Sequence, residues 1–324
     1  MIPAEYMAYE PAVAVGCVNF ARASSKEGSL ARIEANVREA ALQGCEIVVF
    51  PEGALSGSID CSCRFDGSAC AGHRELAETV PGPSTDRIAH LAHELDVYVV
   101  FGMAERDADD PEVLYNAAAV ISPDGILGTY RKVHLGTLPW VTEGITFRPG
   151  SSLPLFSTRF GPIGVLIGDD FWLNPEPSRI LTLKGARLLV NASGTVKGPG
   201  RRDHMVQTSL VRAQENLVYI ASAALVGGIG RIDYSAGHLQ DARADCYVGH
   251  SLIAGPAFPR FGQILVEAED CEEVVSATLS FDKLHRWDSV LPLRQWRAGR
   301  QLGASRLIAE EFAALAKERV TVSS

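Results

Sequence analysis

Short apolar runs alternate along the chain with segments whose apolar residues recur at helical spacing. In the first half, strands are predicted over 12–20, 46–52, 97–102 and as a pair over 116–132, and helices over 29–44 and 84–95. The strand pair surrounds a turn at Pro123, Asp124 and Gly125, residue types that favour tight turns. Strands and helices in alternation are typical of an α/β architecture.

The second half continues this pattern and then changes to strands alone. Strands are predicted over 161–170, 186–193 and 217–228, helices over 176–185 and 203–216, and antiparallel strands with Pro and Gly turns over 250–281. No linker-like stretch divides the series, so we expect one domain.

The predicted domain spans 12–298, between an N-terminal extension at 1–11 and a C-terminal extension at 299–324. The C-terminal extension contains an amphipathic segment at 306–320, which predicts a helix that packs on a neighbouring subunit or lies on the surface.

Composition and charge narrow the classes of partner. With 324 residues, 47% of them hydrophobic and 21% charged, the chain can bury a large core. A net charge of -9 argues against a nucleic-acid partner, which requires a positive surface, so we expect a small-molecule substrate. No apolar stretch is long enough to span a bilayer and the start lacks a signal core, so we expect a cytoplasmic protein outside any membrane.

The cysteines and glycines do not indicate a metal or a cofactor. Seven cysteines, an odd number, fit reduced thiols better than a disulfide framework. Cys61, Cys63 and Cys70 lie close in sequence but lack the paired C-x-x-C spacing of structural zinc sites, so a surface loop is the preferred interpretation. The glycine run at 226–230 is too short for a dinucleotide fingerprint, and we expect no cofactor.

Candidate chemistry begins with two charged residues at predicted strand ends, where open α/β sheets place their sites. Glu52 follows Pro51 at the end of one strand, and Lys132 ends another. A buried carboxylate beside a lysine can act as a general base, and a lysine can stabilise a developing oxyanion. Either residue alone could equally be a solvated residue at the surface. Their combination with the motifs below favours a catalytic site.

Several segments together resemble the nitrilase superfamily of carbon-nitrogen hydrolases. They are FPEG with Glu52, YRKVHL with Lys132, Glu143 shortly before RPG, GVLIGDD, KGARLLVNAS and RAQEN, in the order of that family and within about 13–291. The resemblance implies an α/β fold, a four-layer αββα sandwich, with subunits that pair into αββα-αββα. It also implies a Glu-Lys-Cys site with a second glutamate.

The resemblance assigns roles to individual residues. Glu52 corresponds to the general base, Lys132 to the cation beside the tetrahedral intermediate, and Glu143 to the second glutamate that orients the site. The cysteine of the family falls on Gly168, and the backbone N–H of Asp169 becomes an oxyanion donor. The Asp-Asp doublet after position 168 looks more like the aliphatic amidase branch than the nitrilase branch.

Gly168 has no side chain and cannot perform covalent catalysis, and no cysteine lies near it in sequence. A Cys to Gly change in a working hydrolase would leave Glu52, Lys132 and Glu143 intact, and their presence favours this explanation. A natural relative that lost the covalent step is the alternative. Ala224, at a place where the family often has Asn, supports the alternative. We therefore expect an amidase-type hydrolase lacking its nucleophile, with a silent ligand-binding homologue or an acyl-transfer enzyme as alternatives.

Five residues are candidate substrate contacts: Trp140, Trp172, His134, Arg201 and Arg202. The tryptophans follow Lys132 and position 168 in predicted loops, where they could line an apolar pocket or pack in the core. Either arginine could bind a substrate carboxylate from a basic loop at 194–204, or be solvated. His134 shares a predicted strand face with Lys132 and is either a base or a hydrogen-bonded supporting residue.

Overall fold

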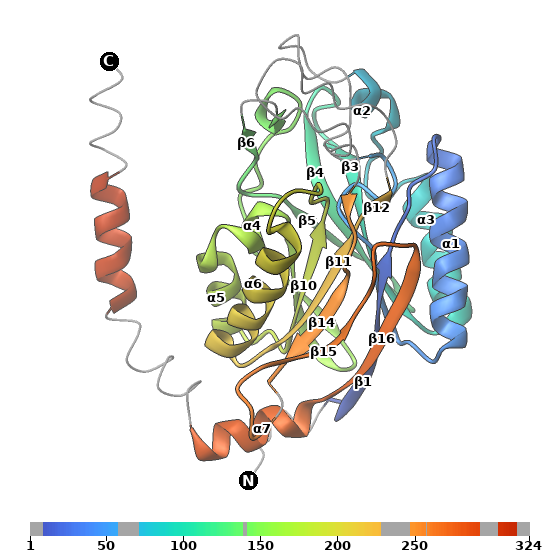
Figure 1. Cartoon of the computed structure of the whole chain (residues 1–324). Coiled ribbons are helices and arrows are strands. Elements are labelled where there is room, and N and C mark those ends of the chain that lie inside the picture. The colour runs from blue at the N-terminus through green and yellow to red at the C-terminus, as the bar shows by residue number, and fades with distance from the viewer. Residues whose placement is uncertain are drawn as a thin grey trace.

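The structure is a computed structural model and describes residues 9–57, 71–138, 141–227, 247–256, 258–291 and 304–315. Two six-stranded sheets lie face to face (Figure 1). The first sheet contains, in spatial order, β16 (Glu273–Ser280), β1 (Ala12–Asn19), β2 (Ile47–Val49), β3 (Tyr98–Arg106), β4 (Leu114–Ser122) and β5 (Gly125–Arg131). The second contains β15 (Gln263–Glu267), β14 (Leu252–Gly255), β11 (Tyr219–Ala224), β10 (Leu188–Ser193), β9 (Gly161–Ile167) and β8 (Leu155–Thr158).

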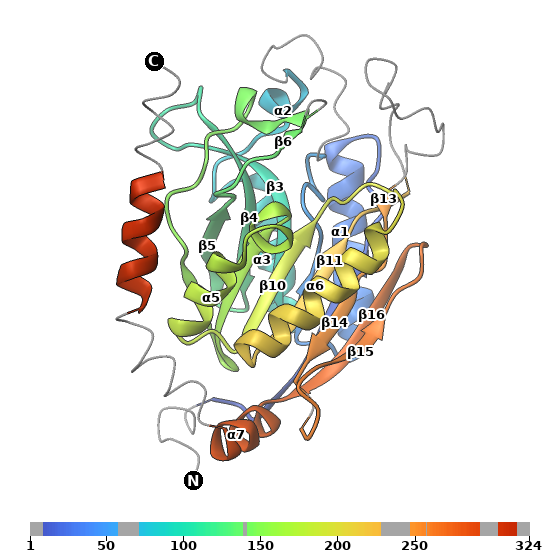
Figure 2. The ribbon, with the colours of Figure 1, turned by 60° about the vertical axis from the view of Figure 1, so that its left-hand side comes forward.

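Helices cover the outer face of each sheet. Helices α1 (Lys26–Leu42) and α3 (Pro83–Leu95) lie against the first sheet, and α5 (Pro175–Leu183) and α6 (Arg201–Asn216) against the second (Figure 2). The predicted αββα sandwich is thus confirmed.

Shorter elements connect these layers. They are α2 (Ala71–Leu76), β6 (Thr137–Leu138), β7 (Val141–Thr142), the 3-10 turn η3 (Glu143–Ile145), α4 (Asp169–Trp172), β12 (Val226–Gly227), β13 (Tyr247–Val248), α7 (Phe281–Val290) and a helix at 304–315. Among the described residues, no helix has the length and apolar character needed to cross a membrane.

Alternation along the strands divides the first sheet's side chains between two cores. Val49 and Val100 face the second sheet and pack in the same cluster as Val165. Their neighbours Val48 and Val99 point the other way, into the cluster formed with α1 and α3. Because successive strand residues face opposite sides, a strand covered on both faces needs an uninterrupted apolar run, and β2 and β3 have one.

Most predicted elements are present, with shifted ends. Helix α1 begins at Lys26 rather than residue 29, because the Ser25 side chain accepts a hydrogen bond from the Gly28 N–H and caps the first turn. Strand β9 ends at Ile167 rather than residue 170, and the next residues form α4. Neither α4 nor α7 was predicted. In α4, four residues are too few to show a helical period.

Parallel pairing brings several strand ends to one edge of the sandwich. Strands β1, β2 and β3 pair in parallel, as do β9, β10 and β11. Strand β5 runs in the direction of β3, because both pair antiparallel with β4. The segments that carry Glu52, Lys132 and Gly168 follow β2, β5 and β9, so the topology gathers residues that are distant in sequence.

Candidate active site

Three buried charged side chains form the centre of the site. The Lys132 Nζ lies 3.1 Å from Glu52 Oε1 and 2.9 Å from Glu143 Oε2. The side chains of Lys132 and Glu52 are 4% and 6% exposed. Burying a charge is costly unless it is paired and hydrogen-bonded, and each of these charges has a partner of opposite sign.

Neutral donors complete the environment of both carboxylates. The Asn116 Nδ2 donates to Glu52 Oε1 at 2.7 Å and to Glu143 Oε1 at 3.0 Å. The Gly194 N–H donates to Glu52 Oε2 at 3.0 Å, and the Gly136 N–H donates to Glu143 Oε2. All four carboxylate oxygens therefore accept a hydrogen bond inside the protein.

The two glutamates differ in proton affinity. Burial raises the pKa of Glu52, and the nearby Lys132 offsets only part of this effect. Burial also opposes ionisation of Glu143, but Lys132 and the Gly136 N–H together hold the pKa of Glu143 below its usual value. Despite burial, the two carboxylates raise the pKa of Lys132, so its ammonium stays charged. Two carboxylates with separated pKa values can take different roles, one accepting protons and one remaining an anion.

Gly168 occupies a sharp turn between β9 and α4, directly beside this cluster. Its φ of 49° and ψ of -111° lie in a region that side chains rarely adopt. A Cβ built on Gly168 would lie 3.1 Å from Glu52 Oε2 and 3.3 Å from Lys132 Nζ. Any side chain at 168 would thus be directed at the buried charges, on the type of strained strand-to-helix turn that can present a nucleophile.

Asp170 connects α4 to the segment that follows Lys132. Its fully buried carboxylate accepts hydrogen bonds from the Tyr130 hydroxyl, the Val133 N–H and the His134 N–H. His134 Nδ1 lies 2.7 Å from Asp170 Oδ1. Strand β5 ends at Arg131, so the prediction that His134 shares a strand face with Lys132 is wrong. The hydrogen-bonded supporting histidine is the arrangement observed.

The His134 contact predicts a small pH-dependent contribution to stability. The hydrogen bond to Asp170 raises the pKa of His134. This contribution is complete below the unfolded pKa of about 6.5 and is lost as the pH rises through the folded value. We expect His134→Gln to lower the free energy of unfolding by less than about 1 kcal/mol, because the side chain is 44% exposed. Urea unfolding should show the loss at about pH 5.5 and little of it at about pH 9; equal losses at both would contradict the assignment.

Of the two tryptophans predicted to contact substrate, only Trp172 lies within the described residues. Trp172 lies in α4 rather than in a loop, is 7% exposed, and donates from Nε1 to Ser193 Oγ at 3.1 Å. Packed against Phe171, it belongs to the core beside the site. Trp140 falls outside the described residues, and so do Cys61, Cys63 and Cys70. In the part of the chain that is described, no group of His, Cys, Asp and Glu could hold a metal ion.

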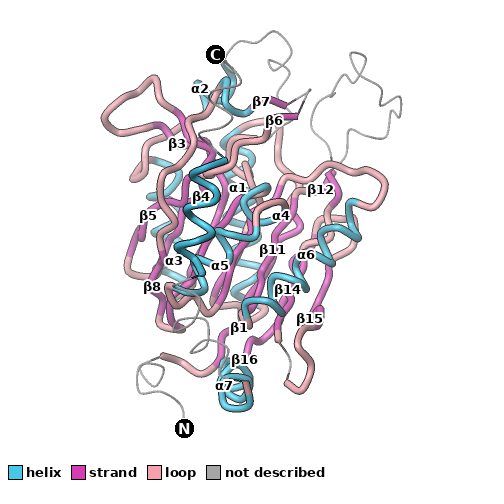
Figure 3. The backbone as a smooth tube through the Cα atoms, turned by 90° about the vertical axis from the view of Figure 1, so that its left-hand side faces the viewer, coloured by secondary structure: helices cyan, strands magenta, loops and turns pink. Residues whose placement is uncertain are grey.

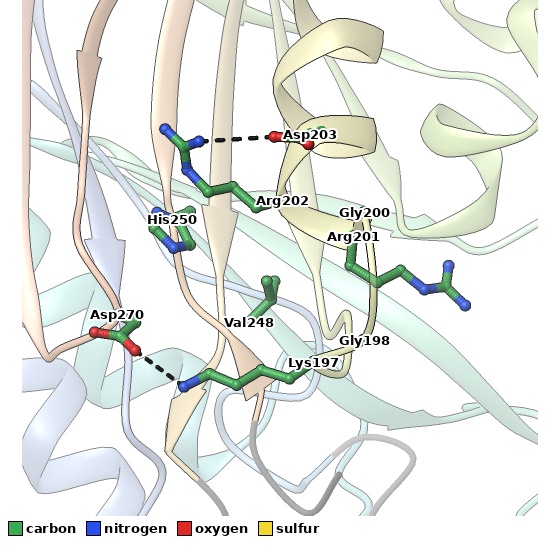
Figure 4. A pocket seen from close by; sticks show the side chains of 9 residues that line it. All are labelled: Lys197, Gly198, Gly200, Arg201, Arg202, Asp203, Val248, His250 and Asp270. Carbon is green, nitrogen blue, oxygen red and sulfur yellow. Dashed lines mark hydrogen bonds and ion pairs between the residues drawn. The ribbon is translucent and has the colours of Figure 1, made fainter. Parts of the chain in front are cut away.

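Arg201 and Arg202 begin α6 and do not lie in a loop as predicted. Arg202 donates hydrogen bonds to both carboxylate oxygens of Glu267, at 2.7 and 3.0 Å. Its guanidinium is therefore paired with the last residue of β15. The Arg201 side chain points the other way (Figure 4). Burial raises the pKa of Asp169, and the charge of Arg201 offsets a small part of this effect. Arg201 is thus electrostatically linked to the segment after Gly168.

The pocket in Figure 4, of about 350 Å³, has both Arg201 and Arg202 among its lining residues. Lys197 and Asp270, 3.1 Å apart, form an ion pair in its wall. None of the three central charged residues lines this pocket.

Sequence reasoning missed Asn116, Gly136, Gly194 and the role of Asp170. Asn116 offered a usable signal, because it is a polar residue within the buried apolar run of β4. The two glycines act through backbone N–H groups, which carry no residue-specific signal.

Comparisons with known proteins identify the family of this chain. The family model for carbon-nitrogen hydrolases matches residues 12–289. A nitrilase of Pyrococcus abyssi is 32% identical over 246 residues, 75% of this chain and 80% of that protein. Omega-amidase NIT2 of Homo sapiens is 32% identical over 288 residues, 85% of this chain and 91% of that protein.

A solved structure extends the agreement to the fold. The carbon-nitrogen hydrolase of Helicobacter pylori G27 superposes with a TM-score of 0.75 at 22% identity, covering 90% of this chain and 96% of the other. The buried glutamate-lysine-glutamate cluster, the αββα sandwich and the matched sequence together place the chain in the nitrilase superfamily: it belongs to the carbon-nitrogen hydrolase family.

Proposed function

We propose that the site is built for hydrolysis of a small-molecule amide through an acyl-enzyme, and that position 168 is the place of its nucleophile. The observation that carries this proposal is the direction of a Cβ at Gly168, toward Glu52 and Lys132 at 3.1 and 3.3 Å. With Gly168 in place, covalent hydrolysis has no attacking atom and the chain is inactive in it.

With a thiol at position 168, each residue of the site has a distinct catalytic role. Glu52 takes the thiol proton as sulfur attacks the amide carbon, and returns a proton to the departing amine. Lys132 and the N–H of Asp169, the first residue of α4, stabilise the oxyanion. Glu143 stays ionised and holds Lys132 in place. Water activated by Glu52 then opens the thioester.

Two observations favour amide chemistry over nitrile chemistry. The Asp169-Asp170 doublet resembles the amidase branch, and one of the relatives is described as an omega-amidase. An acyl-transfer enzyme would use the same groups, with an amine replacing water in the second step.

A silent ligand-binding homologue is the second candidate. It is supported by the complete internal pairing of both buried carboxylates, which needs no turnover to be maintained. Calorimetric titration with a panel of simple amides, combined with an ammonia assay, tests both ideas. Binding without ammonia release is the expected result for the Gly168 protein. The codon at 168 in the source gene separates an introduced change from a natural glycine.

We also propose that the protein forms a homo-oligomer through the outer face of the second sheet's helices. Helices α5 and α6 lie side by side on this face (Figure 3). Three apolar residues of these helices are exposed, Ile180, Leu183 and Val211, at 40, 42 and 46%, and Leu173 at the end of α4 is 64% exposed. Exposed apolar patches of this kind mark interaction surfaces. The helix at 304–315 exposes Leu307, Ile308, Phe312 and Leu315 as well.

A charge placed in this face should break the assembly. We expect the double variant Leu183→Glu, Val211→Glu to sediment as a monomer at concentrations where the parent is a dimer or larger, because two buried carboxylates would lack partners. Leu42→Glu on α1 is the matched control, since Leu42 is 85% exposed and lies on the opposite outer layer. A parent protein that is itself monomeric would refute the assembly.

A further inference from the structure

We propose that Asn116 is a positioning residue, whose side-chain amide holds Glu52 and Glu143 in register with Lys132. This inference rests on the proposed hydrolytic function, which uses both carboxylates. It assigns a role to a residue on β4, in the first sheet, whereas Gly168 follows β9 of the second sheet.

Asn116 contacts every member of the charged cluster. Its Nδ2 donates to Glu52 Oε1 at 2.7 Å and to Glu143 Oε1 at 3.0 Å, and its backbone oxygen accepts the Lys132 N–H at 2.8 Å. Asn116 is 6% exposed, so solvent does not replace these contacts. One residue thus links all three charged residues of the cluster.

The chemistry of a side-chain amide suits this place. Two carboxylates that share a lysine repel each other. Burial is the largest cause of the raised pKa of Glu52, and repulsion by Glu143 adds to it. An amide offers two N–H donors without adding charge, so it can bind one oxygen of each carboxylate. An aspartate would add a third negative charge, and an apolar residue would leave an oxygen of Glu143 without its donor.

Loss of the Asn116 hydrogen bonds should change both the position and the proton affinity of Glu52. Small displacements of a catalytic group cost large factors in rate. The hydrogen bond from Asn116 lowers the pKa of Glu52 against the larger effect of burial, so removing it raises that pKa further. A general base with a raised pKa becomes active only at higher pH.

The test uses the Gly168→Cys protein as parent and compares Asn116→Asp and Asn116→Ser with Asn191→Ser. Asn191 is the matched control: it is a fully buried asparagine whose Nδ2 donates to Ser222 Oγ, outside the cluster. We expect Asn116→Asp to lower kcat by about 100-fold with little change in KM, and the acid limb of the pH profile to move to higher pH. Asn116→Ser, with one donor, should fall between Asn116→Asp and the parent. Equal profiles for the Asn116 and Asn191 variants would overturn the inference.

A second measurement separates this inference from the proposed function. Carbon-13 NMR of the glutamate carboxyl groups in the Gly168 protein follows the titration of Glu52 without any catalysis. An inactive Gly168→Cys protein contradicts the hydrolytic proposal, and the NMR titration still decides the role of Asn116. A Glu52 titration that Asn116→Asp leaves unchanged would refute that role; a shift to higher pH that Asn191→Ser does not reproduce supports it.

Discussion

Gly168→Cys is expected to convert the protein into an amide hydrolase, with a rate at least about 10⁴-fold above that of the Gly168 protein, since loss of a catalytic nucleophile costs up to about 10⁶-fold. The physical reason is that all other groups are in place: the Cβ position lies 3.1 Å from Glu52 Oε2 and 3.3 Å from Lys132 Nζ. Ammonia release from a panel of amides and nitriles measures the effect and identifies the preferred substrate class.

The same substitution should reduce stability. A non-glycine residue at a φ of 49° and ψ of -111° is strained, at a cost of about 1–3 kcal/mol. The Cβ also approaches the Glu52 carboxylate more closely than most Cβ contacts, so that side chain must shift slightly. Gly168→Ala and Gly168→Ser are the controls, because they carry the strain without the thiol and should stay inactive or nearly so. A folded Gly168→Cys protein that releases no ammonia would count against hydrolysis as the function of this site.

Lys132→Met is expected to be the most damaging single change to stability, lowering the free energy of unfolding by about 3–5 kcal/mol. The substitution keeps the size of the side chain but removes the charge that pairs with Glu52 at 3.1 Å and Glu143 at 2.9 Å. Two adjacent carboxylates would then be buried without a cation. Urea unfolding at about pH 7 measures the loss.

The loss should depend on pH in a defined direction. Without the ammonium, burial and mutual repulsion raise the folded-state pKa of both carboxylates above their unfolded values of about 4.3. Protonated carboxyls are then favoured in the folded state, so the variant is relatively most stable at low pH and loses stability as the pH rises through the raised pKa values. Adding Glu143→Gln should restore part of the stability at about pH 7. A loss that is the same at about pH 4.5 and about pH 7 would show that lost packing, not charge, is responsible.

Much of the fold could be predicted because apolar periodicity determines which elements form. The predictions for β1 to β3, α1 and α3 were correct to within a few residues. A strand buried on both faces appears in the sequence as a continuous apolar run, and a helix buried on one face appears as apolar residues at helical spacing. The short helix α4 was missed, and with it the true position of Trp172, because its course depends on the turn at Gly168. The C-terminal amphipathic segment is a helix over 304–315, but its packing partner remains a prediction.

The sequence by itself determined the family and the order of the motifs, and it predicted site roles for Glu52, Lys132, Glu143 and position 168, because motifs depend on residue types at fixed places along the chain. Only the tertiary structure decided that Asn116 joins both carboxylates, that the Gly194 and Gly136 N–H groups complete them, and that Arg202 is bound to Glu267. These contacts join segments that β-strand pairing brings together, and backbone donors have no residue-specific signature. Proton affinities follow from the same contacts, since burial and neighbouring charge exist only in the folded chain.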